Sequence, residues 1–348
     1  AYDELDRLTS ATITGAAAGT APYAHTFTYD ALGNFISKSD TGTYAYAGTG
    51  YANPHAVTSI TTASGAVENF TYDANGNMLS DGMRTYSWNS RNELLSVTNG
   101  ASVTAFAYDH AGNRISKTSP SSSVTYVSGS YEIEDTATGR ISRNYVYDGS
   151  GLIATVETST PAGGSATTAL YFTHSDHLGT SSVVTAGAGA AFPLGSATQE
   201  FDNFPFGETR AEVNRTASPG TPKKFTGKEL DEETGLYYYG ARYYNARIGR
   251  FVSEDPAARD LKDPGAFVRP QIWNTYSYAL NNPVKYIDPT GETPETIIDA
   301  SMTTYDFGRS VKNLGESSYY GAAFYWHFYV TEDYQKASLI YKDLFERD

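Results

Sequence analysis

The sequence contains no cysteine, so disulfide bonds, thiolate zinc sites and cysteine nucleophiles are all excluded, while the redox compartment stays open. Positive charge is also scarce. Lys and Arg number 25 against 39 Asp and Glu, and the resulting net charge of −14 argues against nucleic acid or an anionic membrane as a partner. No apolar run is long enough to predict a membrane span, and no signal peptide is visible.

Standard catalytic motifs are missing as well. The chain has no P-loop, no G-x-S-x-G and no H-E-x-x-H sequence. His174 and His177 flank Asp176 in a spacing that could hold a metal, but the ligand count is short, so we interpret this stretch as a turn that bonds its own loop. The sequence therefore predicts no metal and no cofactor.

The residues in excess are tyrosine, with 29 copies, and glycine, with 32. Tyr, Thr, Val and Ser interrupted by glycine turns are typical of β structure. Tyrosine also suits a wall that is apolar on one side and wet on the other, because its ring packs while its hydroxyl reaches water. We expect a mainly β protein of 348 residues, long enough for a substantial core.

One motif recurs along the first part of the chain, at intervals of about 20 residues or twice that. In each copy a Tyr-Asp pair is followed, after two intervening residues, by a Gly-Asn pair and then by an apolar run. The turn residues are Asp30, Gly33, Asn34, Asp73, Gly76, Asn77, Asp109, Gly112 and Asn113. A weaker copy near Trp88 has Asn92 in the glycine position, which fits because asparagine also tolerates positive φ.

The motif predicts a hairpin. Its aspartate can accept backbone N–H groups in an Asx-turn, its glycine supplies positive φ, and the apolar residues begin the returning strand. A single hairpin cannot bury its face, so successive antiparallel hairpins should pair side by side into a curling sheet over residues 1–220. Because Tyr2-Asp3 already lies inside a copy, we expect the chain to begin within a longer protein that pairs with it.

Residues 225–291 are the richest in rings, glycines and Asp-Pro steps. They contain GLYYYGARYYNARIGRFVSEDP and, further on, NTYSYALNNPVKYIDPTG. These runs resemble the Rhs repeat-associated core that closes Rhs and YD-repeat proteins. The resemblance implies that the hairpins spiral into a hollow β shell (1–220), that the core is 221–291, and that 292–348 is the variable C-terminal segment, usually a toxin. A helix is predicted to begin there at Thr293, giving a short α-helical tail.

The resemblance also implies an activity. Many members use core aspartates to cut their own chain after the final Asp-Pro-x-Gly, which here means the bond between Gly291 and Glu292. By position, Asp288 and Asp255 match those aspartates. The candidate catalytic residues are Asp255, Asp263 as an alternative partner for Asp288, and Arg250 as the arginine that orients a carboxylate. Two neighbouring carboxyls can divide the roles of base and acid.

Three departures argue against cleavage. Ala258 replaces a glycine of the pattern, and 33 residues separate Asp255 from Asp288, more than the spacer of the family. Glu292 is charged where self-cleaving members usually carry an apolar residue. Three functions therefore stay open: a shell that encloses and delivers a toxin, an aspartyl autoprotease, and a cell-surface adhesive YD-repeat protein without a toxin. For the first, the partners would be the enclosed toxin and an immunity protein or secretion-system component, and the protein would be secreted or at the cell surface.

Overall fold

The computed structural model describes residues 1–14, 21–48, 50, 53–149, 151–216, 220–259, 270–292 and 296–297. The predicted mainly β, antiparallel fold is confirmed: every strand pairing named below is antiparallel. Contacts divide the chain into two compact units, Ala1–Thr296 and Ile297–Asp348. Of the second unit only Ile297 lies among the described residues, so the fold below is that of the first unit.

Two large sheets follow the chain order, each strand pairing with the next. The first contains β1 (Ser10–Ile13), β2 (Tyr23–Tyr29), β3 (Phe35–Lys38), β4 (Gly42–Tyr46), β5 (Val57–Thr61) and β6 (Val67–Asn69). The second contains β7 (Thr71–Tyr72), β8 (Met78–Ser80), β9 (Arg84–Trp88), β10 (Leu94–Asn99), β11 (Ser102–Tyr108), β12 (Arg114–Thr118), β13 (Ser122–Ser128), β14 (Tyr131–Thr136), β15 (Gly139–Asp148), β16 (Gly151–Pro161), β17 (Thr167–Ser175), β18 (Ser181–Ala186), β19 (Ala197–Asn203) and β20 (Thr209–Asn214).

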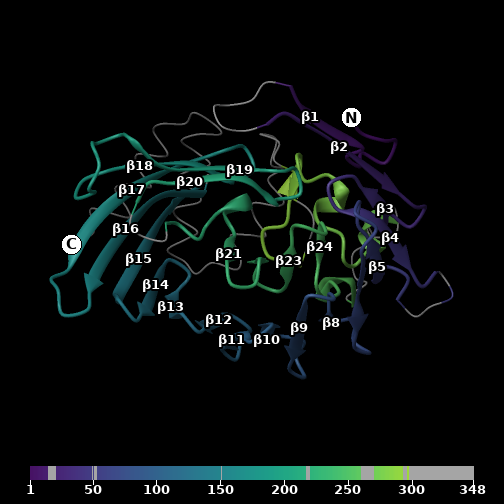
Figure 1. Ribbon diagram of the computed structural model, residues 1–348, viewed down its shortest axis with the longest axis horizontal. Helices are drawn as coiled ribbons and strands as arrows, with labels where there is room; N and C mark the ends of the chain where they lie inside the picture. Colours follow the sequence, from purple (N-terminus) through teal and green to yellow (C-terminus); the bar gives the residue numbers. More distant parts are fainter. Residues whose placement is uncertain are drawn as a thin grey trace, which may run out of the picture. The chain divides into compact units, whose positions relative to one another are not determined.

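A small third sheet is formed by β21 (Glu229–Asp231), β22 (Leu236–Tyr238), β23 (Tyr243–Asn245) and β24 (Arg250–Phe251). Short 3₁₀ turns flank it: η1 (Phe225–Gly227), η2 (Pro256–Arg259), η4 (Pro270–Trp273) and η5 (Ala279–Asn281). Strands β25 (Tyr286–Ile287) and β26 (Thr296–Ile297) follow. In Figure 1 the two large sheets run along a curve, and the third sheet lies on its concave side.

The hairpin turns lie where the repeats predict them. Asp30 Oδ1 accepts the backbone N–H groups of Leu32 (2.8 Å) and Asn34 (2.9 Å), and its Oδ2 accepts the Asn34 side-chain amide. The turns at Asp73 and Asp109 repeat these bonds. The glycines at the three turns have φ of 78°, 80° and 86°, in the order of the chain. Each turn is therefore closed by one carboxylate and one residue with left-handed backbone.

A β-bulge follows each of these three turns and two further hairpin turns, and the sequence pattern did not predict it. On five returning strands the pairing register skips one apolar residue just after the turn. The skipped residues are Ile36, Leu79, Leu95, Ile115 and Ile153, each partly exposed. A bulge bends its strand and increases the right-handed twist. Because the bulge recurs at the same place in successive hairpins, the bends add up and the sheet curls.

The curve brings the last hairpin back to the first. The ring of Phe204, in the turn between β19 and β20, lies 5.1 Å from Tyr23 and 4.5 Å from His25 on β2. Phe206 from the same turn packs against Phe27 and Phe35, with ring centroids 5.1 and 5.2 Å apart.

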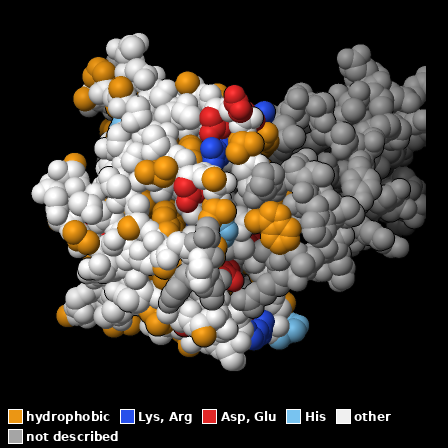
Figure 2. Space-filling view, turned by 90° about the vertical axis from the view of Figure 1, so that its right-hand side faces the viewer, with side chains coloured by type: hydrophobic (Ala, Val, Ile, Leu, Met, Phe, Trp, Pro, Cys, Tyr) orange, Lys and Arg blue, Asp and Glu red, His pale blue; other side chains and the backbone are white. Residues whose placement is uncertain are grey.

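Charges are sparse on the face shown in Figure 2, where apolar side chains lie scattered among polar ones.

The main hydrophobic core is shared between the repeats and the third sheet. Repeat residues such as Phe35, Met78 and Phe106 form one buried cluster with Leu236 and Tyr243 of the third sheet. A second cluster of buried rings belongs to the segment that follows the repeats: Phe225, Tyr237, Tyr239, Tyr244, Phe251 and Tyr278. The third sheet thus fills the interior of the curve. The boundaries at 220 and 291 stay predictions.

The expected helix after Thr293 is corrected at its start. Thr296–Ile297, the described part of that segment, is the strand β26, and β-branched residues favour extended backbone. Residues 293–295 and 298–348, where the rest of the helical tail was predicted, lie outside the described residues.

Two of the repeat turns allow a direct test of the turn geometry. Valine at Gly76 or Gly112 must adopt positive φ, which should lower the free energy of unfolding by about 1–3 kcal/mol in each case. The loss should be larger at Gly76, because a Cβ there lies 2.7 Å from the Glu254 side chain, whereas the nearest atom at Gly112 is 3.4 Å away. Urea unfolding measures both. Gly129→Val is the control, since a Cβ meets nothing within 4 Å there, and losses equal to the control's would contradict the argument.

Candidate functional site

The candidate site lies in the turn Asp288–Gly291, which directly follows β25. Asp288 is fully buried, and its Oδ1 accepts the backbone N–H groups of Gly291 at 2.7 Å and Thr290 at 3.2 Å. This Asx-turn is the same device that closes the repeat hairpins. Gly291 has φ of 77°, and a Cβ on it would lie 3.1 Å from Tyr239. The turn therefore requires both the aspartate and the glycine.

A single buried arginine, Arg242, joins the groups of the site. Its Nη2 lies 3.0 Å from Asp288 Oδ2 and 3.0 Å from Asp255 Oδ2. Its Nε donates to the carbonyl oxygen of Gly291, and its Nη1 donates to the carbonyl oxygen of Thr275. Two carboxylates and the carbonyl of the predicted scissile bond therefore converge on one guanidinium.

The guanidinium is held in place by the third sheet. Arg242 lies in the loop between β22 and β23, and its guanidinium carbon is 3.7 Å from the centre of the Phe251 ring on β24. Stacking on a ring and bonding to two carboxylates suit the flat, permanently charged guanidinium. Burial without these partners would cost several kcal/mol.

The two carboxyls of the site have different surroundings. Burial raises the pKa of Asp255 to about 6, Arg242 opposes this, and the charges of Asp288 and Glu292 add to it. Asp288 Oδ1 accepts two backbone amides, whereas Asp255 Oδ1 accepts the N–H of Ala257 at 2.9 Å. Asp255 is therefore suited to carry a proton in mildly acidic solution beside a second carboxylate, as an acid–base pair requires.

Arg250, the arginine expected from the sequence to orient a carboxylate, lies against other partners in the structure. Its Nη2 donates to the carbonyl of His55 (2.8 Å) and to Asn274 Oδ1 (2.9 Å). The arginine between the carboxylates is Arg242, because the loop after β22 folds back onto the Asp288 turn while Arg250 points to the first repeats. Asp263 lies outside the described residues. A charged residue within the ring-rich run was the signal that could have identified Arg242.

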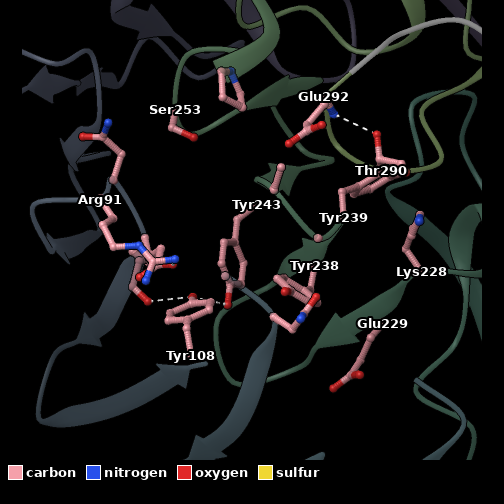
Figure 3. A pocket seen from close by; sticks show the side chains of 18 of the residues that line it. Arg91, Tyr108, Lys228, Glu229, Tyr238, Tyr239, Tyr243, Ser253, Thr290 and Glu292 are labelled. Atoms are coloured by element: carbon pink, nitrogen blue, oxygen red, sulfur yellow. Dashed lines mark hydrogen bonds and ion pairs between the residues drawn. The ribbon is translucent and has the colours of Figure 1, made fainter. Parts of the chain in front are cut away.

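A cavity of about 750 Å³ adjoins the predicted cleavage site. Thr290 and Glu292 lie at one side of it, Tyr238, Tyr239 and Tyr243 line its middle, and Arg91 comes from a repeat turn opposite (Figure 3). Lys228, Asn77 and Asn113 contribute further polar atoms. The bond after Gly291 therefore faces a polar space inside the curve of the sheets.

His174 lies at the end of β17, and the chain turns directly after it at Asp176–Thr180. Asp176 Oδ1 accepts the backbone N–H groups of Leu178 and Thr180. His177 Nε2 lies 2.9 Å from the carbonyl oxygen of Val284, and His174 bonds Thr185. Within the described ranges, no group of three or more His, Asp or Glu could hold a metal ion. No helix among those residues is both long and apolar enough to cross a bilayer.

Comparison with known proteins gives the family. The family model of the teneurin YD-shell matches residues 1–284. The chain belongs to the YD-shell family. Among curated relatives, this YD-shell chain is 32% identical over 247 residues to the tRNA3(Ser)-specific nuclease WapA of Bacillus spizizenii, covering 69% of this chain and 10% of that protein. It is 27% identical over 314 residues to toxin subunit YenC1 of Yersinia entomophaga, covering 78% and 29%.

A third relative is the toxin protein Tse5 of Pseudomonas aeruginosa, 34% identical over 122 residues, which covers 35% of this chain and 8% of Tse5. Among solved structures, the TcdB2–TccC3–Cdc42 complex superposes with a TM-score of 0.57 at 23% identity, covering 84% of this chain and 17% of that chain. The YD-shell fold is therefore shared. This chain spans about a tenth of the WapA relative and under a third of YenC1.

The raised pKa of Asp255 predicts a pH dependence of stability. A carboxyl with a raised pKa binds its proton more tightly in the folded state, so its contribution is full below an unfolded pKa of about 4 and is lost as the pH rises through about 6. The free energy of unfolding of the wild type should fall relative to Asp255→Asn by up to about 3 kcal/mol between pH 4 and 7.

Denaturant unfolding at several pH values measures this difference. Asp109→Asn is the matched control, because hydrogen bonds from Asn113 lower the pKa of Asp109, so the wild type should show no fall relative to that variant over the same range. A constant difference between the wild type and Asp255→Asn would contradict the assignment.

Proposed function

We propose that this chain is the closing part of an Rhs-type shell that encloses and delivers a C-terminal toxin. The observation that supports it most is the direction of the chain. The hairpins curl around the third sheet, and the segment after Gly291 departs from a turn whose first and last residues, Asp288 and Gly291, are buried and which adjoins the cavity lined by Thr290 and Glu292. On this proposal, a C-terminal segment that starts at this point begins inside the curve.

The names of the relatives support the proposal that the enclosed segment is a toxin. WapA is a tRNA nuclease, Tse5 is a toxin protein and YenC1 is a toxin subunit. Each is longer than this chain. On this proposal the cargo is the segment that begins at Glu292. On this proposal the protein is secreted or delivered from the cell, and its partners are the preceding part of its own chain, the enclosed toxin, and an immunity protein or secretion-system component.

Protease protection tests enclosure in the full-length parent protein. If the shell encloses the segment after Gly291, a tag at the C-terminus should resist proteinase K at least tenfold longer than the same tagged segment expressed without the shell. The tag is read by immunoblot with time. Equal rates of digestion in the two proteins would contradict enclosure. A tag inserted at the exposed Gly129 turn is the control for protease activity, and it should be cut in both the presence and the absence of cargo.

A second candidate function is cleavage of the Gly291–Glu292 bond, favoured by the convergence of Asp255, Asp288 and Gly291 on Arg242. A water would attack the Gly291 carbonyl carbon while Asp288 takes a proton from it. Asp255 would give its proton to the nitrogen of Glu292 as the C–N bond breaks. The products are a carboxylate on Gly291 and a free amine on Glu292. Arg242 would stabilise the negative charge that develops on the carbonyl oxygen.

Intact-mass measurement on the purified chain tests this function. The wild type should give two fragments, 1–291 and 292–348, and Asp288→Asn should remain a single chain with unchanged β content by circular dichroism. Asp30→Asn is the matched control, because it alters an Asx-turn of the same kind whose residues do not line the cavity beside the cleavage site, and it should leave the two fragments. A wild-type chain that keeps its full mass would rule out the cleavage.

A further inference from the structure

The three residues before the Gly291–Glu292 bond are each held by a hydrogen bond that their carbonyl group accepts. The carbonyl oxygen of Gly291 accepts from Arg242 Nε, and that of Thr290 accepts from the backbone N–H of Ala241 at 3.0 Å. The carbonyl oxygen of Pro289 accepts from the side-chain ammonium of Lys228. Two of these donors belong to the loop after β22. The third comes from a separate part of the chain.

Lys228 occupies a fixed position. It directly follows η1, where its backbone N–H donates to the carbonyl of Phe225, and Thr226 Oγ1 bonds the hydroxyl of Tyr239 at 2.8 Å. The Lys228 ammonium lies 5.3 Å from the centre of the Tyr239 ring. It lines the same cavity as Thr290 and Glu292 (Figure 3). The side chain thus spans from the η1 turn to the segment that would be cut.

We propose that Lys228 is a positioning residue for cleavage of the Gly291–Glu292 bond, acting through its ammonium on the carbonyl of Pro289. The proposal rests on the second function above and adds a residue to it. Lys228 touches none of the atoms that react. It fixes the far end of the Asp288–Gly291 turn, while Arg242 fixes the near end.

A proline at 289 explains why a side-chain donor is needed there. Pro289 has no N–H and its ring fixes φ, so the peptide plane can be oriented only through its carbonyl group. Removing the donor lets the turn shift relative to Arg242 and Asp255, and a misplacement of about 1 Å costs about 100-fold in rate. We expect Lys228→Met to slow cleavage by at least about tenfold.

The charge state of Lys228 supplies a second readout. Burial lowers its pKa to about 8, Asp288 opposes this and Lys223 adds to it. Tyr239, which is also titratable, lies against it through its ring. The ammonium is therefore charged below pH 8 and neutral above it. The ratio of wild-type to Lys228→Met rates should be largest below pH 8 and should shrink above it, which a loss of folding alone would not produce.

The experiment follows cleavage in time after cell-free synthesis of the whole chain, with dilution into buffers from pH 5.5 to 9 and quantification of fragment 292–348. Lys228→Met should be slow, Lys228→Arg should restore the rate to within about threefold, and Lys285→Met should match the wild type, because Lys285 is exposed and bonds Asp6. Thermal unfolding of each variant in an Asp288→Asn background checks that the fold is kept.

The outcomes separate the two proposals. A wild-type rate for Lys228→Met with the wild type cleaving normally would overturn the role of Lys228 alone. A slow Lys228→Arg that is fully folded would also overturn it, because the charge would then not be what matters. No cleavage in the wild type, under conditions where it is folded, would overturn the cleavage function and the role of Lys228 together.

Discussion

The Asx-turn of the repeats is the interaction on which the rest of the fold depends. One aspartate oxygen accepts two backbone N–H groups and the other accepts an asparagine amide, so a single carboxylate closes the hairpin and satisfies donors that the strand ends leave unpaired. The turn fixes where the returning strand begins and therefore where its bulge falls. Repeated bulges bend the sheet, and the bend creates the interior that the third sheet fills.

The turns also form the surface to which the ring-rich segment attaches. Asn281 donates to the carbonyl of Gly33 at 3.0 Å, and the Tyr276 hydroxyl donates to the carbonyl of Gly76 at 2.6 Å. Asn34, almost completely buried, accepts from Asn274 at 3.0 Å. Polar groups at the turns are thus paired across the interface and not left unsatisfied, which burial demands. The repeats bind the segment through hydrogen bonds at their turns and through rings along their strands.

Buried charges make a second attachment between the two parts. Arg114 on β12 lies 2.8 Å from Glu229 and 2.6 Å from Asp231 on β21, and Lys117 lies 2.9 Å from Asp231. Removing one member of such a group is costly, because it leaves a charge buried without its partner. The Arg242 site has the same construction, with one cation between two carboxylates. At the Arg242 site, however, the carbonyl group of Gly291 bonds the arginine and a cavity adjoins the turn. This neighbourhood of a peptide bond and a cavity distinguishes a candidate reaction site from a structural one.

Local chemistry in the sequence determined the hairpins, their turn residues and the Asx-turn at Asp288, because each depends on residues within five positions of one another. It could not distinguish Arg242 from Arg250, since both precede Asp255 in a ring-rich run and only folding decides which one faces the carboxylates. The bulges were hidden because an apolar residue after a turn is equally compatible with a regular strand. Lys228 and Pro289 are far apart in the chain, so only the packing of η1 against the third sheet brought the ammonium to the carbonyl.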